Sequence, residues 1–364
     1  HTQFLNMMSY EDIISSEFSN LTPEALKKPG ELLLNIKHKC LPQVPDKKCH
    51  CPNPFTPSTR ADTRPNWMFA HNVNTQLALE SASRGAHHLD IVFFGDSITE
   101  HWRGTKYGHD VTSSSGLQGA VRVFDKLFNT ENGGKLEGLP LGLSGDTTHN
   151  LLWRLQNGEL PAHLNPSVYW LLIGTNDFGD EECSAEMCLL GIIRVIEELR
   201  KKKPYATIVV NSLLPRTNDA YGYLFWIKKL RRRKAPRIVL WPHLLAVNKQ
   251  LESYCRRNQS NRKHDERYGG LLFFNATNIF LEKYDGMEDD PSQASSLSIN
   301  LDLNLLKRDL DSQSNDIFMG DQTDIRINHT LMENDFLHPS PVGHYVWGVA
   351  IVNFLLENNV TNDV

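Results

Sequence analysis

Short apolar runs alternate with segments of helical spacing along most of this 364-residue chain. Five runs are rich in strand-forming residues and end at glycine or small polar residues: 91–94, 139–143, 168–173, 206–211 and 271–275. Helical spacing predicts helices over 67–84, 121–128, 150–157, 184–203, 243–256 and 341–358. Strands that alternate with helices predict a mainly parallel sheet covered by helices on both faces, which is an α/β fold.

Residues 1–65 differ from the rest because they show no sustained periodicity and carry many prolines. This pattern predicts an extended N-terminal arm that wraps a single domain over residues 66–364. Three stretches, at about 104–137, 217–242 and 281–330, are interpreted as insertions in that domain. The second contains six cations in residues 228–234, which suit either a solvated helix face or a site for phosphate or an acidic glycan. The third is acidic and predicts a surface segment.

The overall composition is globular, with 40% hydrophobic and 22% charged residues. A formal net charge of −5 gives no general attraction to nucleic acid or to an anionic membrane surface. No apolar run approaches the length that is needed to cross a bilayer. We therefore expect no nucleic-acid partner and no transmembrane segment.

An even number of cysteines permits three disulfides. The six are Cys40, Cys49, Cys51, Cys183, Cys188 and Cys255. Pairing of Cys40 with Cys49 or Cys51, and of Cys183 with Cys188, would close short local loops. Together with His38 and His50, the first three cysteines could instead bind zinc, although their spacing fits no standard zinc finger. Disulfides or free thiols are the favoured interpretation, and we expect no metal.

The chain begins at His1 without an initiator Met. Five N-x-S/T triplets occur, at Asn20, Asn258, Asn275, Asn328 and Asn359. About three would arise by chance in a chain so rich in Asn, Ser and Thr, so the triplets add only mild support for glycosylation. Together with the paired cysteines, these features predict a secreted or lumenal protein.

The first predicted strand ends at Gly95 and is followed directly by Asp96 and Ser97. Aspartate and serine are preferred helix caps, so one interpretation is that they only start a helix. The other interpretation is catalytic, because ligands of open α/β sheets bind outside the carboxyl ends of the strands. Ser97 would then stand where a nucleophile is needed.

Other predicted strand ends and a loop near the C-terminus supply the partners that a nucleophilic serine requires. Gly145 and Asn176 follow the second and third predicted strands, and Asp335 and His338 precede the last helix. His338 can accept the serine proton, while Asp335 can hold the imidazole in the required tautomer. The backbone N–H groups of Ser97 and Gly145 and the Asn176 amide could stabilise an oxyanion. No cofactor is needed for this chemistry.

These residues resemble the SGNH, or GDSL-type, hydrolases. The similar blocks, in order, are Gly95-Asp96-Ser97-Ile98, the glycine block at Gly145, Gly174-Thr175-Asn176-Asp177, and Asp335 with His338. The resemblance is closest to the branch that contains the catalytic subunits of platelet-activating-factor acetylhydrolase, through 67–68, 71–72, 144–149, 152–160, 213–216 and 335–340. It covers about residues 66–280 and 331–357.

The resemblance implies a flavodoxin-like three-layer sandwich with a five-stranded parallel sheet. It also implies a serine esterase for short, acetyl-type acyl groups, with a Ser97–His338–Asp335 triad, and dimeric subunits. The substrate would be a small-molecule or glycan ester, with an acetylated phospholipid as the alternative. Two further alternatives stay open: acyl transfer at the same site, and a catalytically silent glycan-binding protein.

Overall fold

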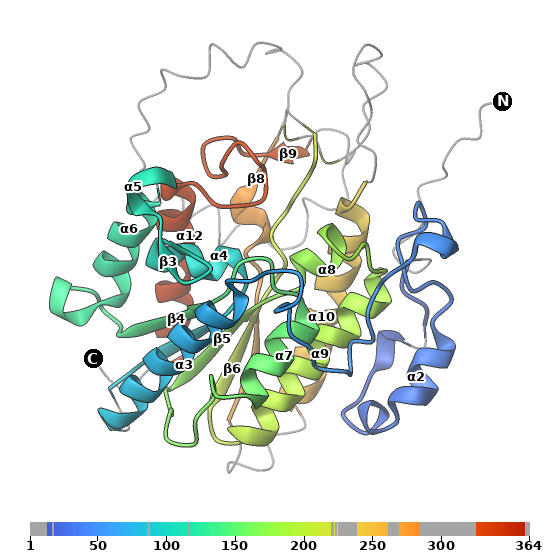
Figure 1. Ribbon diagram of the computed structural model, residues 1–364, viewed down its shortest axis with the longest axis horizontal. Helices are drawn as coiled ribbons and strands as arrows, with labels where there is room; N and C mark the ends of the chain where they lie inside the picture. Colours follow the sequence, from blue (N-terminus) through green and yellow to red (C-terminus); the bar gives the residue numbers. More distant parts are fainter. Residues whose placement is uncertain are drawn as a thin grey trace.

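A five-stranded parallel sheet forms the centre of the molecule (Figure 1). The computed structural model describes residues 13–16, 18–85, 88–115, 117–219, 222, 224, 239–260, 269–283 and 325–360. The strands are β1 (Ile91–Gly95), β4 (Gly138–Gly142), β5 (Val168–Leu172), β6 (Thr207–Asn211) and β7 (Leu271–Phe274). Their spatial order is β4-β1-β5-β6-β7. The five strands predicted from apolar runs are therefore all present, each within two residues of its predicted ends.

Two groups of helices cover the two faces of this sheet (Figure 1). On one side α7 (Thr148–Gln156) packs against α9 (Ala185–Lys202), which packs against α10 (Trp241–Ser260). On the other side α6 (Gln118–Phe128) packs against α12 (Pro341–Glu357). This strand order and layering confirm the predicted flavodoxin-like three-layer α/β sandwich.

The sheet is buried because both of its faces carry helices. Every residue of β1 and of β5 is buried, which explains why these strands read as continuous apolar runs rather than alternating ones. Aromatic rings extend the core across the sheet, since Trp170 contacts both Phe93 and Phe274. The strand ends are therefore held by a closely packed interior.

The N-terminal segment contains short helical turns, at 3-10 helices Phe18–Asn20, Ala25–Lys27 and Asp46–Lys48 and at α2 (Pro29–Asn35). Elements of three to seven residues are too short to show periodicity, which is why the sequence suggested only an extended arm. Ile14, Phe18 and Leu21 are buried in the main core. Helix α3 (Trp67–Ser83) follows, as predicted.

The disulfides differ in part from the predicted pairs. Cys40–Cys49 is present, but Cys183 pairs with Cys51 and not with Cys188. Cys188 is a free, buried thiol that lies on α9 and points to the carbonyl of Gly174, and burial raises its pKa. Because Cys40, Cys49 and Cys51 are all oxidised, the zinc interpretation is wrong, and the described residues contain no group of three His, Cys, Asp or Glu that could hold a metal.

The first insertion forms a small hairpin and two helices ahead of β4. The hairpin pairs β2 (Thr105–Lys106) with β3 (His109–Asp110), and α5 (Thr112–Ser115) and α6 follow it. At the base of the acidic insertion, β8 (Leu281–Lys283) pairs with β9 (Ile325–Ile327). The basic run 228–234 and residues 284–324 lie outside the described residues. Among the helices that are described, none is long and apolar enough to span a membrane.

Candidate active site

Ser97 is the first residue of α4 (Ser97–Glu100), and only Asp96 separates it from the end of β1. Asp96 caps this short helix, because its Oδ1 accepts the N–H of Ile98 at 3.0 Å. The cap is fully buried, and burial raises the pKa of Asp96 to about 6. Gly95 has no room for a side chain, since a Cβ there would stand 2.5 Å from the carbonyl oxygen of Leu172. The capping interpretation therefore applies to Asp96 and leaves the Ser97 hydroxyl unused by the helix.

The structure brings Ser97, His338 and Asp335 into one line of hydrogen bonds. His338 Nε2 lies 2.8 Å from Ser97 Oγ, and His338 Nδ1 lies 2.6 Å from Asp335 Oδ2. Asp335 Oδ1 also accepts the backbone N–H groups of Leu337 and His338, both at 3.0 Å. Burial works to raise the pKa of Asp335, but these hydrogen bonds and the His338 charge hold that pKa well below its usual range.

The loop that carries Asp335 and His338 is closed on itself before α12. The N–H of Glu333 donates to the carbonyl of His338 at 2.8 Å, and Ser340 caps α12 by accepting the N–H of Gly343 at 3.1 Å. Phe336 adopts φ +48°, a left-handed conformation that is uncommon for a residue with a side chain. These contacts fix the His338 imidazole relative to the last helix. His338 is 241 residues away from Ser97 in the sequence.

A second imidazole, His101, packs on the ring of His338 and was not predicted as a site residue. The two ring centroids are 4.4 Å apart. Burial, followed by the charges of His338 and His344, lowers the pKa of His101 to about 3, so this ring stays neutral. The available signal was spacing, because His101 stands four residues after Ser97 and so shares its helical face.

The loop that carries Gly145 is held to α4 by the buried carboxylate of Glu100. Glu100 Oε2 accepts both the backbone N–H of Ser144, at 2.7 Å, and its hydroxyl, at 2.6 Å. Gly145 adopts φ +77°, which favours glycine. Among the described residues, no hydrogen bond is donated by the backbone N–H of Ser97 or of Gly145.

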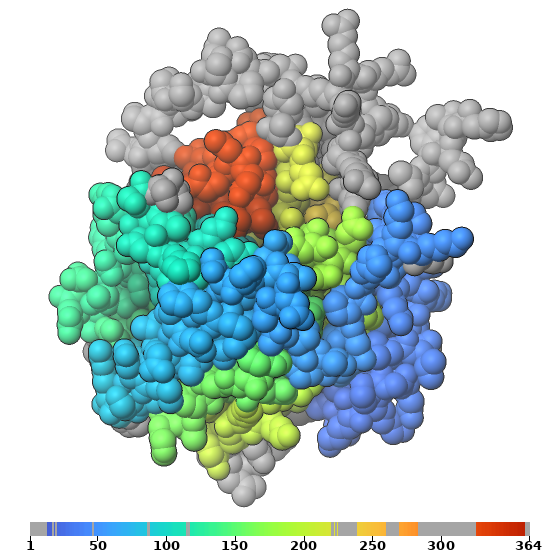
Figure 2. All heavy atoms as spheres, in the orientation of Figure 1, coloured from blue at the N-terminus to red at the C-terminus, as the bar shows by residue number. Residues whose placement is uncertain are grey.

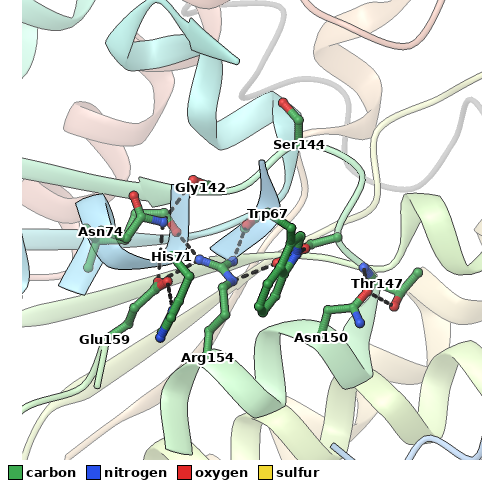
Figure 3. A network of polar contacts seen from close by, with 12 residues as sticks. Trp67, His71, Asn74, Gly142, Ser144, Thr147, Asn150, Arg154 and Glu159 are labelled. Atoms are coloured by element: carbon green, nitrogen blue, oxygen red, sulfur yellow. Dashed lines mark hydrogen bonds and ion pairs between the residues drawn. The ribbon is translucent and has the colours of Figure 1, made fainter. Parts of the chain in front are cut away.

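Arg154 of α7 connects the strand ends through a buried polar network (Figure 3). Its guanidinium donates to the carbonyl oxygens of Gly95 at 2.7 Å and Leu141 at 3.1 Å, at the ends of β1 and β4. It also pairs with the carboxylates of Asp146 and Glu159, each at 2.6 Å. Trp67, His71 and Asn74 of α3 donate to or contact these carboxylates from the other side (Figure 3).

Asn176 lies on α8 (Thr175–Gly179), just beyond β5. Its Nδ2 donates to the carbonyl of Asp146 at 2.9 Å, which joins the Asn176 loop to the Gly145 loop. Asp177 strengthens this junction by accepting the N–H and hydroxyl of Thr148, at 3.0 and 2.6 Å. Burial raises the pKa of Asp177 to about 7. The two segments that carry Gly145 and Asn176 are thus joined by hydrogen bonds at the carboxyl ends of the strands.

Comparison with known proteins identifies related chains. Residues 93–263 match the GDSL-like Lipase/Acylhydrolase family. The platelet-activating factor acetylhydrolase IB subunit alpha1 of Bos taurus is 32% identical over 127 residues, which are 35% of this chain and 44% of that one. The alpha2 subunit of Rattus norvegicus is 31% identical over 150 residues, or 41% and 52% of the two chains. This chain spans about half the length of the curated relatives it matches.

Two solved structures give more distant likenesses. A GDSL-like lipase from Bacteroides thetaiotaomicron has a TM-score of 0.41 and 16% identity, and covers 79% of this chain and 98% of that one. A carbohydrate esterase of family 3 from Talaromyces cellulolyticus has a TM-score of 0.40 and 13% identity, and covers 74% and 97%.

Proposed function

Because residues 93–263 match the GDSL-like Lipase/Acylhydrolase family, we propose that the chain is a serine esterase with Ser97 as its nucleophile. The observation that carries this proposal is the line of hydrogen bonds from Ser97 Oγ through both ring nitrogens of His338 to Asp335. A serine hydroxyl is a weak nucleophile until a base accepts its proton. In this geometry the base lies within hydrogen-bond distance, and a carboxylate fixes its tautomer.

In the acylation step, Ser97 Oγ attacks the ester carbonyl carbon while its proton moves to His338 Nε2. The tetrahedral intermediate collapses, the bond to the alcohol oxygen breaks, and that oxygen takes the proton from His338. In the second step a water molecule attacks the acyl-enzyme and gives its proton to the same nitrogen. That proton returns to Ser97 Oγ as the carboxylic acid leaves. Asp335 stabilises the imidazolium that forms in each step.

Three donors are proposed for the oxyanion: the backbone N–H groups of Ser97 and Gly145 and the side-chain amide of Asn176. The first two donate no hydrogen bond to any described residue, as a donor reserved for substrate requires. The third has one N–H on the Asp146 carbonyl, which leaves its second N–H for the substrate. Preorganised donors of this kind are worth about 3–4 kcal/mol each in transition-state stabilisation.

The proposed substrate is an ester with a short, acetyl-type acyl group. Support comes from the names of the relatives, which are acetylhydrolases. An acyl-chain series of p-nitrophenyl esters on the purified protein tests this proposal, with Ser97→Ala beside Ser83→Ala, which removes an exposed hydroxyl on α3. We expect kcat/KM to fall as the acyl chain lengthens and to be lost in Ser97→Ala alone. Hydrolysis that persists in Ser97→Ala would overturn the proposal.

A secreted or lumenal location is also proposed, since disulfides persist in oxidising compartments. Of the five glycosylation triplets, Asn258 is unsuited as an acceptor because its side chain is buried and donates to the Tyr254 carbonyl at 2.9 Å. Treatment of the natively produced protein with a glycosidase tests the other four, and recovery from the medium tests secretion. Light scattering tests the proposed homodimer.

A further inference from the structure

Part of the N-terminal segment is held against the loops that carry Gly145 and Asn176. The N–H of Ser58 donates to the carbonyl of His149, and Asn150 Nδ2 donates back to the Ser58 carbonyl at 3.0 Å. The disulfide from Cys51 to Cys183 attaches the same segment beyond α8. Figure 2 shows the blue N-terminal part of the chain lying against the yellow-green part. Residues 51–60 are therefore fixed beside the candidate active site.

This attachment places the guanidinium of Arg60 next to Gly145. Arg60 Nη2 pairs with Asp180 Oδ2 at 3.2 Å, and the Arg60 side chain is only 11% exposed. Arg60 Nη1 lies 3.2 Å from the position that a Cβ on Gly145 would occupy. Nη1 is buried and has no hydrogen-bond partner among the described residues. A buried donor of this kind is costly unless an acceptor completes it, and a substrate oxygen would be such an acceptor.

Tyr107 approaches the same glycine from the β2–β3 hairpin. Its hydroxyl lies 3.6 Å from the position of a Cβ on Gly145. The ring packs on the small apolar cluster of Trp67, Ala70 and Leu143, and the backbone adopts φ +52°. Non-glycine residues rarely adopt this conformation, and such outliers gather at binding and active sites. Two hydrogen-bonding side chains from separate segments thus meet beside one proposed oxyanion donor.

The positive and negative charges around Arg60 nearly balance. Arg60 lies near Asp180 and Glu181, and a second guanidinium, that of Arg216, contacts Gly179 and donates to the carbonyl of Thr175 at 2.7 Å. The carboxylate of Asp146 also lies near Arg60, so the two guanidinium groups leave no excess positive charge to select an anionic ligand. Contact with an alkyl chain would also remove water from these charged and hydroxyl groups without replacing its hydrogen bonds, which is unfavourable. Neutral hydroxyl groups, such as those of a sugar, suit these neighbours better.

We propose that Arg60 and Tyr107 form a substrate subsite that binds hydroxyl oxygens on the alcohol side of a carbohydrate ester. Arg60 Nη1 donates to a sugar oxygen, and the Tyr107 hydroxyl can both donate and accept. The inference rests on the proposed esterase function and names its substrate class. It also gives the N-terminal segment a role in binding.

The test compares kcat/KM for a monoacetylated methyl xyloside and for hexyl acetate, which share one acyl group. Hydrogen bonds to charged groups are worth about 1.5–3 kcal/mol, so Arg60→Met should lower the sugar-to-alkyl ratio about tenfold or more. Tyr107→Phe should lower the ratio less, by about threefold to tenfold, because its hydroxyl is neutral. Arg64→Met is the matched control, since Arg64 is an exposed arginine of the same turn, and its ratio should match the wild type.

An unchanged ratio in Arg60→Met, or an equal loss on both esters, would overturn the subsite. Arg60→Lys keeps the charge near Asp180 but lacks the second guanidinium donor, so it supplies a folded variant if Arg60→Met does not fold. Its ratio should fall as well, and a wild-type ratio in that variant would also overturn the subsite. If the wild type hydrolyses neither ester nor p-nitrophenyl acetate, it is the esterase proposal that fails.

Discussion

At the scale of single residues, His338 uses both ring nitrogens, and each bond depends on the other. Asp335 accepts from Nδ1, so Nε2 is left without a proton and can accept one from Ser97. The depressed pKa of Asp335 keeps its carboxylate ionised throughout the neutral range. In the proposed mechanism, the carboxylate therefore sets the direction of proton transfer, although only the imidazole contacts the serine.

Asp335→Asn tests this dependence. An amide can donate to Nδ1, which would place the imidazole proton on Nε2, facing Ser97. We expect kcat on p-nitrophenyl acetate to fall by roughly 10³–10⁴-fold while the fold is kept. Asp62→Asn, on an exposed aspartate of the N-terminal segment, should leave kcat unchanged. A loss of less than tenfold in Asp335→Asn would mean that Asp335 does not set the tautomer.

Because the His101 ring is neutral in the folded protein, we predict that it makes folding stability depend on pH. Its pKa is lowered from 6.5 to about 3, so below pH 6.5 the unfolded chain takes up a proton that the folded chain does not. The contribution of His101 to the unfolding free energy is fully present above pH 6.5 and is lost as the pH falls toward 3. Between pH 6.5 and 4, the wild type should lose about 3 kcal/mol more unfolding free energy than His101→Phe.

Urea unfolding at several pH values measures this difference. His163→Phe is the control, because His163 is exposed, and its pH dependence should follow the wild type. Parallel curves for the wild type and His101→Phe would show that His101 is not held neutral by the fold.

Residues at strand ends were predictable, whereas residues that approach the site laterally were not. Ser97, Gly145 and Asn176 follow apolar runs directly, so the parallel sheet alone places them at one edge. His338 and Asp335 were found through their spacing ahead of the last helix. Arg60 and Tyr107 reach Gly145 through a disulfide-anchored segment and a two-residue hairpin turn, neither of which carries a periodic signal.

At the scale of elements, Arg154 joins three parts of the fold. It reaches the last residue of β1, the end of β4 and the loop that holds Gly145 and Asp146. Asp146 in turn accepts from Asn176, so the ends of β1, β4 and β5 share one buried network. The relative positions of the proposed nucleophile and oxyanion donors therefore depend on a side chain that is fully buried.

Arg154→Met should destabilise the fold strongly. The substitution leaves the carboxylates of Asp146 and Glu159 buried without their cation, which costs about 3–5 kcal/mol. Arg256→Met removes an exposed i,i+4 pair with Glu252 on α10 and should cost less than about 1 kcal/mol. Chemical denaturation of both variants measures the contrast. A similar small cost in both would show that Arg154 does not carry the network.

The elements of the sheet could be predicted because buried parallel strands are uniformly apolar and short. The helical turns of the N-terminal segment could not, because three to seven residues do not complete two turns of periodic pattern. Disulfide pairing could be predicted only in part, since Cys40–Cys49 was one of the expected local pairs and Cys51–Cys183 was not expected. Local spacing favoured Cys183 with Cys188, but α9 turns Cys188 into the core, away from Cys183.

At the scale of the whole molecule, the two disulfides constrain the chain to different degrees. Cys51–Cys183 closes a separation of 132 residues, whereas Cys40–Cys49 closes only 9. In the chain-entropy model, stabilisation grows with the logarithm of loop length. The long-range disulfide therefore both stabilises the fold and keeps the N-terminal segment on the site.

Paired serine variants should separate these two contributions. Cys51→Ser with Cys183→Ser should lose about 5 kcal/mol of unfolding free energy, against about 3 kcal/mol for Cys40→Ser with Cys49→Ser. Denaturation of both oxidised variants beside the wild type measures the two losses. A larger loss for the short loop would contradict this assignment of stability.

The central claim is that Ser97 is the nucleophile of a charge-assisted triad, and covalent labelling tests it most directly. The wild type is treated with a fluorophosphonate, and its intact mass and labelled peptide are measured by mass spectrometry. We predict one phosphonyl group per chain, on Ser97, and no label on Ser97→Ala. Label on another residue, or no label in a preparation that hydrolyses esters, would contradict the account.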